Sequence, residues 1–213
     1  MHQNNEVAEN VAKSLLQVKA VKLSPNEPFT WASGWSSPIY CDNRLTLSYP
    51  QIRTYIRQEF VKKIQDEIGH IDLIAGVATG GIAIGALVAQ EMGLPFAYVR
   101  SSQKEHGLTN QIEGVVESGQ RVVVIEDLIS TGGSSLKAVE ALREAGCNVK
   151  AIIAIFNYGF DVATERFKEA KCRMLSLSDY DALIEFAINS DYIQQADYNK
   201  LKKWREDPAN WKK

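Results

Sequence analysis

Residues 122–135 read VVVIEDLISTGGSS and contain the strand, loop and helix signals that decide the fold. The first four residues are all β-branched, which is typical of a parallel strand buried on both faces. Beyond the loop, apolar residues at positions 136, 139 and 142 have helical spacing. The sequence therefore predicts a strand at 122–125, two acids, a tight loop and a helix at 134–145.

The loop at 130–134 contains only serine, threonine and glycine. At a helix N-terminus such a loop offers backbone N–H groups and hydroxyls to an anion. Glu126 and Asp127 can accept hydrogen bonds from hydroxyl groups or help to hold a hydrated metal. The stretch contains neither a P-loop pattern nor a dinucleotide-binding glycine pattern. We therefore expect a ligand that has a phosphate at one end and hydroxyl groups nearby.

Strand and helix signals alternate on both sides of this stretch. Strands are predicted at 71–77, 96–100, 122–125, 150–156 and 173–177, and helices between them at 82–91, 134–145 and 162–170. This alternation indicates an α/β fold, with a mostly parallel five-stranded sheet flanked by helices and ligands at the carboxyl ends of the strands. Within the long connection after position 100, residues 115–116 could form a hairpin with 122–123.

The two ends of the chain do not continue the alternation of strand and helix signals seen in this core. Helices are predicted at 6–20 and 50–69, and the segment 29–44 between them indicates a small lobe outside the alternation. After position 179, two further helical patterns cover 182–187 and 192–204. We expect one domain over 1–213, in which 1–48 form the N-terminal helix and lobe, 70–178 the core, and 179–213 the C-terminal helices.

Composition excludes several function classes. The 213 residues carry a net charge of −2, which does not favour nucleic acid binding. Residues 73–89 lack charge, but four glycines divide them into strand, turn and helix, so no membrane span is expected. The N-terminus is polar, unlike a signal peptide. The three cysteines show neither disulfide nor zinc spacing, which favours a reducing, cytoplasmic setting.

Three stretches carry a resemblance to a known family. VVVIEDLISTGGSS resembles the phosphoribosyl pyrophosphate (PRPP) motif of type I phosphoribosyltransferases. FTWASGWSSPIYCDNR, at 29–44, resembles the N-terminal hood of orotate phosphoribosyltransferases, and YVRSSQKEHG, at 98–107, resembles their mobile catalytic loop. The resemblance covers most of the chain.

The resemblance implies an activity and its requirements. Orotate phosphoribosyltransferases transfer ribose 5-phosphate from PRPP to N1 of orotate in pyrimidine biosynthesis and release pyrophosphate. They require Mg²⁺, which PRPP mainly carries, so no direct metal ligand is expected from the protein. In the family the mobile loop reaches the partner's site, which implies a homodimer, with no nucleic acid or membrane partner.

The matching positions imply the site residues. The catalytic residues would be Arg100, Lys104 and His106, which can stabilise the departing pyrophosphate. The PRPP-binding residues would be Arg100, Lys104, His106, Glu126, Asp127, Leu128, Ile129, Ser130, Thr131, Gly132, Gly133, Ser134, and, from a second cradle after the first core strand, Thr79 and Gly80. The orotate-binding residues would be Ser130, Tyr40 and Arg44.

The chain departs from the family pattern at several basic positions. Many relatives have a second basic residue where this chain has Ser101, and some have lysine in place of Ala32 or Gly80. No arginine occurs at 156–160, where some branches place one near the base carboxylate. We therefore expect hood amides around 36–40, with Arg44, to meet that carboxylate.

The sequence leaves three alternatives open. Arg44 could instead form a structural ion pair with Asp42. A purine phosphoribosyltransferase would share the phosphate cradle but lack the hood. A regulator that senses PRPP would retain the fold, but the chain shows no DNA-binding addition or basic RNA-binding face.

Overall fold

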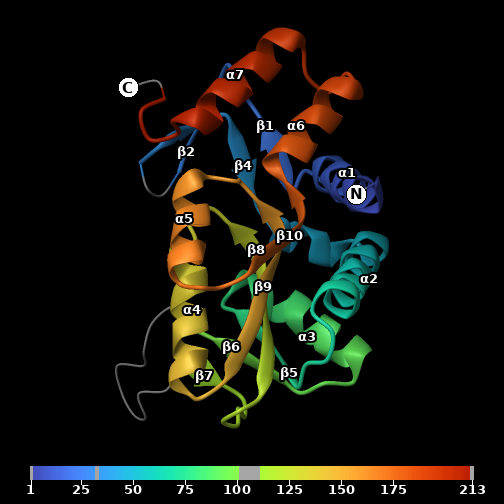
Figure 1. Cartoon of the computed structure of the whole chain (residues 1–213). Coiled ribbons are helices and arrows are strands. Elements are labelled where there is room, and N and C mark those ends of the chain that lie inside the picture. Colours follow the sequence, from blue (N-terminus) through green and yellow to red (C-terminus); the bar gives the residue numbers. More distant parts are fainter. Residues whose placement is uncertain (1, 32–33, 101–110, 212–213) are drawn as a thin grey trace.

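A six-stranded sheet forms the centre of the computed structural model, which describes residues 2–31, 34–100 and 111–211 (Figure 1). Its order is β10-β9-β8-β5-β6-β7. The strands are β5 (Leu73–Val77), β6 (Phe96–Val99), β7 (Ile112–Glu113), β8 (Arg121–Ile129), β9 (Asn148–Asn157) and β10 (Met174–Asp179). Every neighbouring pair is parallel except β6 and β7. The five predicted parallel strands are confirmed, and β7 adds a short antiparallel edge.

The predicted hairpin between 115–116 and 122–123 is wrong. Residues 115–116 are not in a strand, and the preceding β7 pairs with β6 instead. β8 has no free edge for a hairpin because β5 and β9 occupy both of its sides. Val115 accordingly lies at the surface, with 75% of its area exposed.

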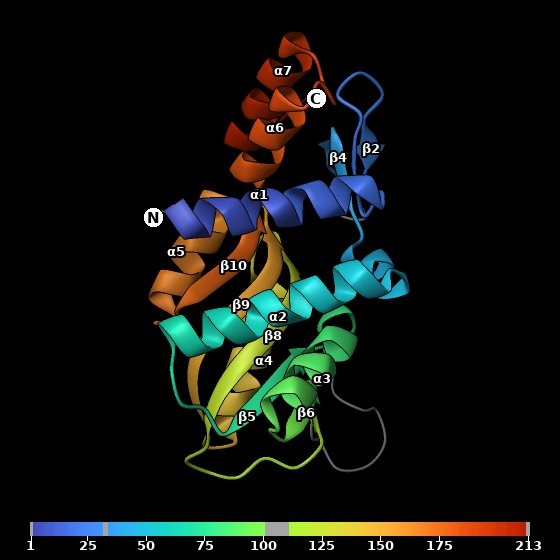
Figure 2. The ribbon, with the colours of Figure 1, turned by 90° about the vertical axis from the view of Figure 1, so that its right-hand side faces the viewer.

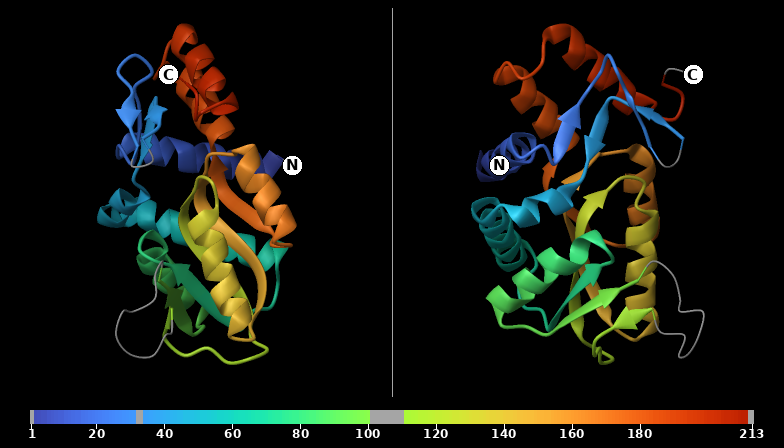
Figure 3. Two further views of the ribbon diagram at one scale, coloured as in Figure 1. Left: turned by 90° about the vertical axis from the view of Figure 1, so that its left-hand side faces the viewer. Right: turned by 180° about the vertical axis from the view of Figure 1, so that it is seen from behind.

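Helices cover both faces of the sheet. Figure 2 shows α1 (His2–Gln17), α2 (Pro50–Glu67) and α3 (Gly80–Met92) across one face. The left view of Figure 3 shows α4 (Gly133–Glu144) and α5 (Asp161–Glu169) over the other. This three-layer arrangement confirms the predicted α/β class, and none of the helices in the described ranges has the length and apolar character needed to cross a membrane.

Side chains of β8 alternate between two buried clusters. Val123 and Ile125 pack in the cluster with α1, α2 and α3, whereas Val122 and Val124 pack in the cluster with α4 and α5. All four are fully buried, and each such side chain contributes about 1.5–3 kcal/mol relative to an exposed one. This double burial explains why the strand carries an unbroken β-branched run.

The predicted N-terminal lobe is formed by two short hairpins. β1 (Val21–Leu23) pairs with β4 (Ile39–Cys41), and β2 (Phe29–Thr30) pairs with β3 (Ser36–Ser37). A 3-10 helix, η1 (Asn43–Ser48), leads from this lobe to α2. We call residues 21–41 the hood. It lies beside α6 (Tyr180–Asn189) and α7 (Gln195–Glu206) at one end of the molecule (Figures 1 and 3).

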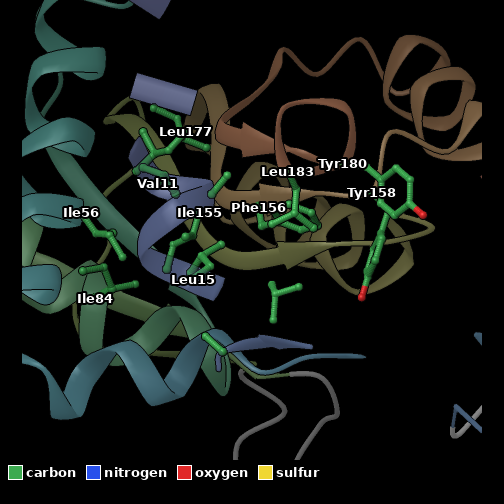
Figure 4. Packing of buried hydrophobic residues seen from close by; sticks show 14 of the residues in the cluster. Val11, Leu15, Ile56, Ile84, Ile155, Phe156, Tyr158, Leu177, Tyr180 and Leu183 are labelled. Atoms are coloured by element: carbon green, nitrogen blue, oxygen red, sulfur yellow. The ribbon is translucent and has the colours of Figure 1, made fainter. Parts of the chain in front are cut away.

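Figure 4 shows how the larger cluster joins the helices to the sheet. This cluster includes Val11 and Leu15 of α1, Ile155 of β9 and Leu177 of β10. At the far end of the cluster the rings of Tyr158 and Tyr180 lie close together, with centroids 6.4 Å apart. The core therefore extends from α1 to the aromatic side chains below the hood.

Candidate active site

β8 continues four residues past its predicted end and includes the two acids. Glu126 pairs with Ala154 of β9, and the pairing continues to Ile129. Consecutive side chains in a strand point to opposite faces. The two carboxylates consequently meet different helices, although they are neighbours in the chain.

Glu126 points towards α4. Ser135 Oγ donates to Glu126 Oε2 at 2.9 Å, and the Asp127 amide donates to Oε1 at 3.0 Å. Only 4% of Glu126 is exposed. Burial raises the pKa of this carboxyl well above its usual range, and the adjacent Asp127 raises it further, against the opposing bond from Ser135. Glu126 therefore holds its proton more tightly than a solvent-exposed glutamate does.

Asp127 points towards the start of α3. A Cβ atom added to Gly80 would lie 2.1 Å from Asp127 Cγ, so a larger residue here would require the Asp127 side chain to move. The N-terminus of α3 favours a negative charge at this point. The Thr79 side chain makes no capping hydrogen bond to the first N–H groups of this helix. The fold thus brings together residues from two separate sequence motifs: Thr79 and Gly80 from one, and Asp127 from the other.

The loop after β8 forms the predicted anion cradle. Gly132 has a φ of +77° and precedes the first turn of α4. This conformation is accessible to glycine at little cost. No side chain caps α4, and its first turn has no acidic residue, so the N–H groups around Gly133 and Ser134 can meet a phosphate.

A cavity of about 390 Å³ opens next to this cradle. It is lined by Thr30, Trp31, Trp35, Tyr40, Cys41, Leu128, Ser130, Thr131 and Tyr158. The predicted base contacts Tyr40 and Ser130 are both among these residues. The flat aromatic walls and the size suit a small heterocyclic ring.

Three aromatic residues of this cavity were missed by sequence reasoning. Trp31 and Trp35 stack with centroids 6.4 Å apart, and Trp31 lies 5.1 Å from the ring of Tyr158. The Trp31 indole N–H donates to the carbonyl of Ile39 at 3.0 Å, which fixes the ring within the hood. The density of aromatic residues at 29–40 and 156–160 could have identified this wall.

Asn43 is a second residue that the sequence did not single out. Its Nδ2 donates to the Asp127 carbonyl at 2.6 Å, and Cys41 Sγ donates to its Oδ1 at 3.2 Å. Only 1% of Asn43 is exposed. It therefore connects the cavity wall at Cys41 to the acidic pair of β8.

Arg44 adopts the ion pair that was the alternative to base binding. Its Nε lies 2.7 Å from Asp42 Oδ1, and its NH2 group donates to Oδ2 at 2.9 Å. The Arg44 side chain is 58% exposed and does not line the cavity. The hydrogen bonds from Arg44 lower the pKa of Asp42. A contact between Arg44 and the base stays a prediction.

The predicted cationic residues divide into two groups. Arg100 follows β6, and its NH1 group lies 3.5 Å from Glu113 Oε1 on β7, a partner that the sequence did not predict. Lys104 and His106 lie outside the described residues. Their roles stay predictions.

The described residues fit a metal ion that is held mainly by a bound small-molecule ligand, with few direct bonds to the protein. Across 2–31, 34–100 and 111–211, no three His, Cys, Asp or Glu side chains gather as a metal cluster. Glu126 and Asp127 do supply the carboxylate oxygens that Mg²⁺ prefers. Two carboxylates suit contacts through a bound ligand or water better than a closed protein site.

Known proteins match the chain over nearly its full length. Residues 48–190 match the family model described as "Phosphoribosyl transferase domain". The orotate phosphoribosyltransferase of Phocaeicola vulgatus is 56% identical over 200 residues, which cover 94% of each chain. The chain belongs to the orotate phosphoribosyltransferase family.

Solved structures of this family and of a related longer protein share the fold. Orotate phosphoribosyltransferase from Aeropyrum pernix matches 86% of this chain and 99% of its own, with a TM-score of 0.75 and 28% identity. UMP synthase from Leishmania donovani matches 93% of this chain with a TM-score of 0.79 and 28% identity, and the chain spans 42% of that protein. The family resemblance of the sequence motifs is thereby confirmed.

Proposed function

We propose that this protein transfers the 5-phosphoribosyl group of PRPP to N1 of orotate, giving orotidine 5′-phosphate and pyrophosphate in pyrimidine biosynthesis. One observation carries the proposal beyond family membership. Ser130 and Thr131 belong both to the anion cradle and to the wall of the aromatic cavity. A sugar phosphate in the cradle would therefore present its anomeric carbon to a base in the cavity.

The binding residues act in three places. The amides of 131–134 would hold the 5′-phosphate, and Glu126 and Asp127 would accept hydrogen bonds from the ribose hydroxyls. Each charge-assisted bond contributes about 1.5–3 kcal/mol. Thr79 and Gly80 would offer backbone groups to the pyrophosphate.

The chemistry needs positioning and no protein nucleophile. N1 of orotate attacks the anomeric carbon while the bond to the pyrophosphate oxygen breaks, and that oxygen keeps the electron pair. Arg100, Lys104 and His106 would stabilise the charge that grows on pyrophosphate, and Lys104 and His106 can supply its protons. Mg²⁺, bound mainly to PRPP, would supply further charge stabilisation.

The base contacts follow from the cavity. Ser130 and Tyr40 line it and would contact orotate. Hood amides around 36–40 would meet the carboxylate of the base, and Arg44 could join them by leaving Asp42. A structure with orotate that lacks hood contacts would contradict this arrangement.

We further propose that the chain acts as a homodimer in the cytoplasm and forms one phosphoribosyltransferase domain. Residues 98–107 would complete the site of the partner subunit and exclude water from the reaction. The three free thiols of Cys41, Cys147 and Cys172 suit a reducing compartment.

A competition assay tests the proposed activity. The purified protein receives PRPP and Mg²⁺ with orotate, adenine and uracil, and spectrophotometry follows each acceptor. We expect orotate alone to be consumed. Consumption of adenine without orotate would indicate a purine enzyme, and PRPP binding without turnover would indicate a sensor.

A further inference from the structure

We propose that Trp204 of α7 is a positioning residue for the acceptor base. The proposal rests on the function proposed above, because it concerns the cavity that would hold orotate. Trp204 does not line that cavity but lies directly behind it. It lies 14 residues beyond the matched phosphoribosyl transferase region, which ends at 190.

Trp204 contacts both walls of the cavity at once. Its ring centroid lies 5.6 Å from that of Trp31 in the hood and 6.0 Å from that of Tyr158, which follows β9. Both contacts are edge-to-face, a favourable geometry for aromatic pairs. Trp204 thus supports from behind the direct contact between Trp31 of the hood and Tyr158 of the sheet wall, whose ring centroids are 5.1 Å apart.

A hydrogen bond adds direction to this packing. The Trp204 indole N–H donates to the carbonyl of Ser36 at 3.2 Å. Ser36 belongs to β3, which pairs with only two residues of β2. Since such a short hairpin has little stability of its own, external bonds contribute strongly to its position. Trp204 is fully buried, so bulk water does not compete for this hydrogen bond.

Further contacts fix α7 against the sheet side of the cavity. The Tyr180 hydroxyl donates to the carbonyl of Leu201 at 3.0 Å. Arg205 NH1 donates to the carbonyl of Gly159 at 3.0 Å, one residue after Tyr158. The ring of Tyr180, shown beside Tyr158 in Figure 4, also lies 5.5 Å from Trp204. The helix therefore holds the indole rigidly enough to locate the hood.

This arrangement predicts a selective kinetic effect. The hood contributes Trp31, Trp35 and Tyr40 to the base cavity, whereas the anion cradle is built from β8 and α4. Loss of the indole should loosen the base cavity and leave the cradle in place. The KM for orotate should rise while the KM for PRPP stays constant.

The experiment compares three variants in the full-length protein. Trp204→Leu should raise the KM for orotate about tenfold and change the KM for PRPP less than about twofold. Trp204→Phe keeps an aromatic ring but loses the N–H donor, so its KM for orotate should rise about threefold. Ile64→Ala is the control, because Ile64 is fully buried in α2 and lines no part of the cavity.

The control separates positioning from stability. Ile64→Ala should lower the Tm by several degrees with the KM for orotate unchanged. An unchanged KM for orotate in both Trp204 variants would overturn the proposal, as would an equal rise in both KM values. If Trp204→Leu fails to fold, the Trp204→Phe result decides alone. A wild-type protein that binds PRPP but does not consume orotate would instead overturn the proposed function.

Discussion

The anion cradle and the base cavity share Ser130 and Thr131 but are built in different ways. The cradle comes from one continuous segment, in which β8 leads through a loop into α4. The cavity draws on residues from Thr30 to Tyr158, and Trp204 supports it from α7. Backbone pairing with β9 positions the first region, whereas packing between distant side chains positions the second.

This difference implies that the two substrates can be perturbed separately. Changes in the cradle should affect PRPP, and changes behind the hood should affect orotate. Kinetic constants measured for each substrate at saturating levels of the other would test this separation.

The largest effect is expected from Asp127→Asn. The substitution removes a charged acceptor for a ribose hydroxyl, so kcat/KM for PRPP should fall about 10- to 150-fold. The KM for orotate should change little, because Asp127 does not line the base cavity. Steady-state kinetics with each substrate varied in turn provide the measurement.

Asp161→Asn supplies a control for this substitution. Asp161 is an exposed acid in the first turn of α5 and does not line the base cavity. Its replacement should leave both kinetic constants within about twofold of wild type. A loss that falls equally on both substrates in Asp127→Asn would contradict the separation of the two regions.

The cradle could be predicted from sequence because its signals are local. The β-branched run, the acids and the glycine-rich loop lie within 14 residues, and each follows from its own backbone requirements. The end of β8 was placed four residues early because Glu126 and Asp127 are polar. Their strand conformation depends on pairing with β9, which a local pattern does not contain.

The cavity could be predicted only in part, since its contacts are distant in sequence. Tyr40 and Ser130 were found through the family motifs. Trp31 and Tyr158 are 127 positions apart, and their contact depends on how the hood folds over the sheet. The ion pair of Arg44 with Asp42 shows the same limit, because a short-range partner competes with the expected ligand.

A middle-sized effect is expected from Asn43→Ala, which tests whether the two regions are linked. The substitution leaves the Asp127 carbonyl without its donor, a loss of about 1–3 kcal/mol when the group is buried. Because Asn43 also accepts from Cys41 in the cavity wall, both KM values should rise several-fold. Kinetics and the Tm of the same preparation provide the measurement.

Thr46→Ala is the matched control for Asn43→Ala. Thr46 Oγ1 donates to the Asn43 carbonyl at 2.6 Å, so its loss weakens the same turn without touching Asp127. It should lower the Tm with little change in either KM. If Asn43→Ala raises the KM for only one of the two substrates, Asn43 supports only the anion cradle or only the base cavity.

The smallest effect is expected in the pH dependence of stability. The folded protein holds the proton on Glu126 more tightly than the unfolded chain, because burial and Asp127 raise its pKa. Between the ordinary pKa of glutamate, about 4.3, and the raised value, the free energy of unfolding should fall as the pH rises. A single proton limits this slope to about 1.4 kcal/mol per pH unit.

Glu126→Gln removes the titrating group and keeps an oxygen that can accept from Ser135. Relative to wild type, the variant should therefore become more stable as the pH rises above the ordinary pKa of glutamate, about 4.3. Urea unfolding of both proteins across this range measures the difference. Parallel curves would mean that the folded state does not favour the proton on Glu126. A difference in unfolding free energy that increases with pH would mean that ionising Glu126 destabilises the folded protein. Sugar hydroxyls that bind the ionised carboxylate could offset this loss of stability.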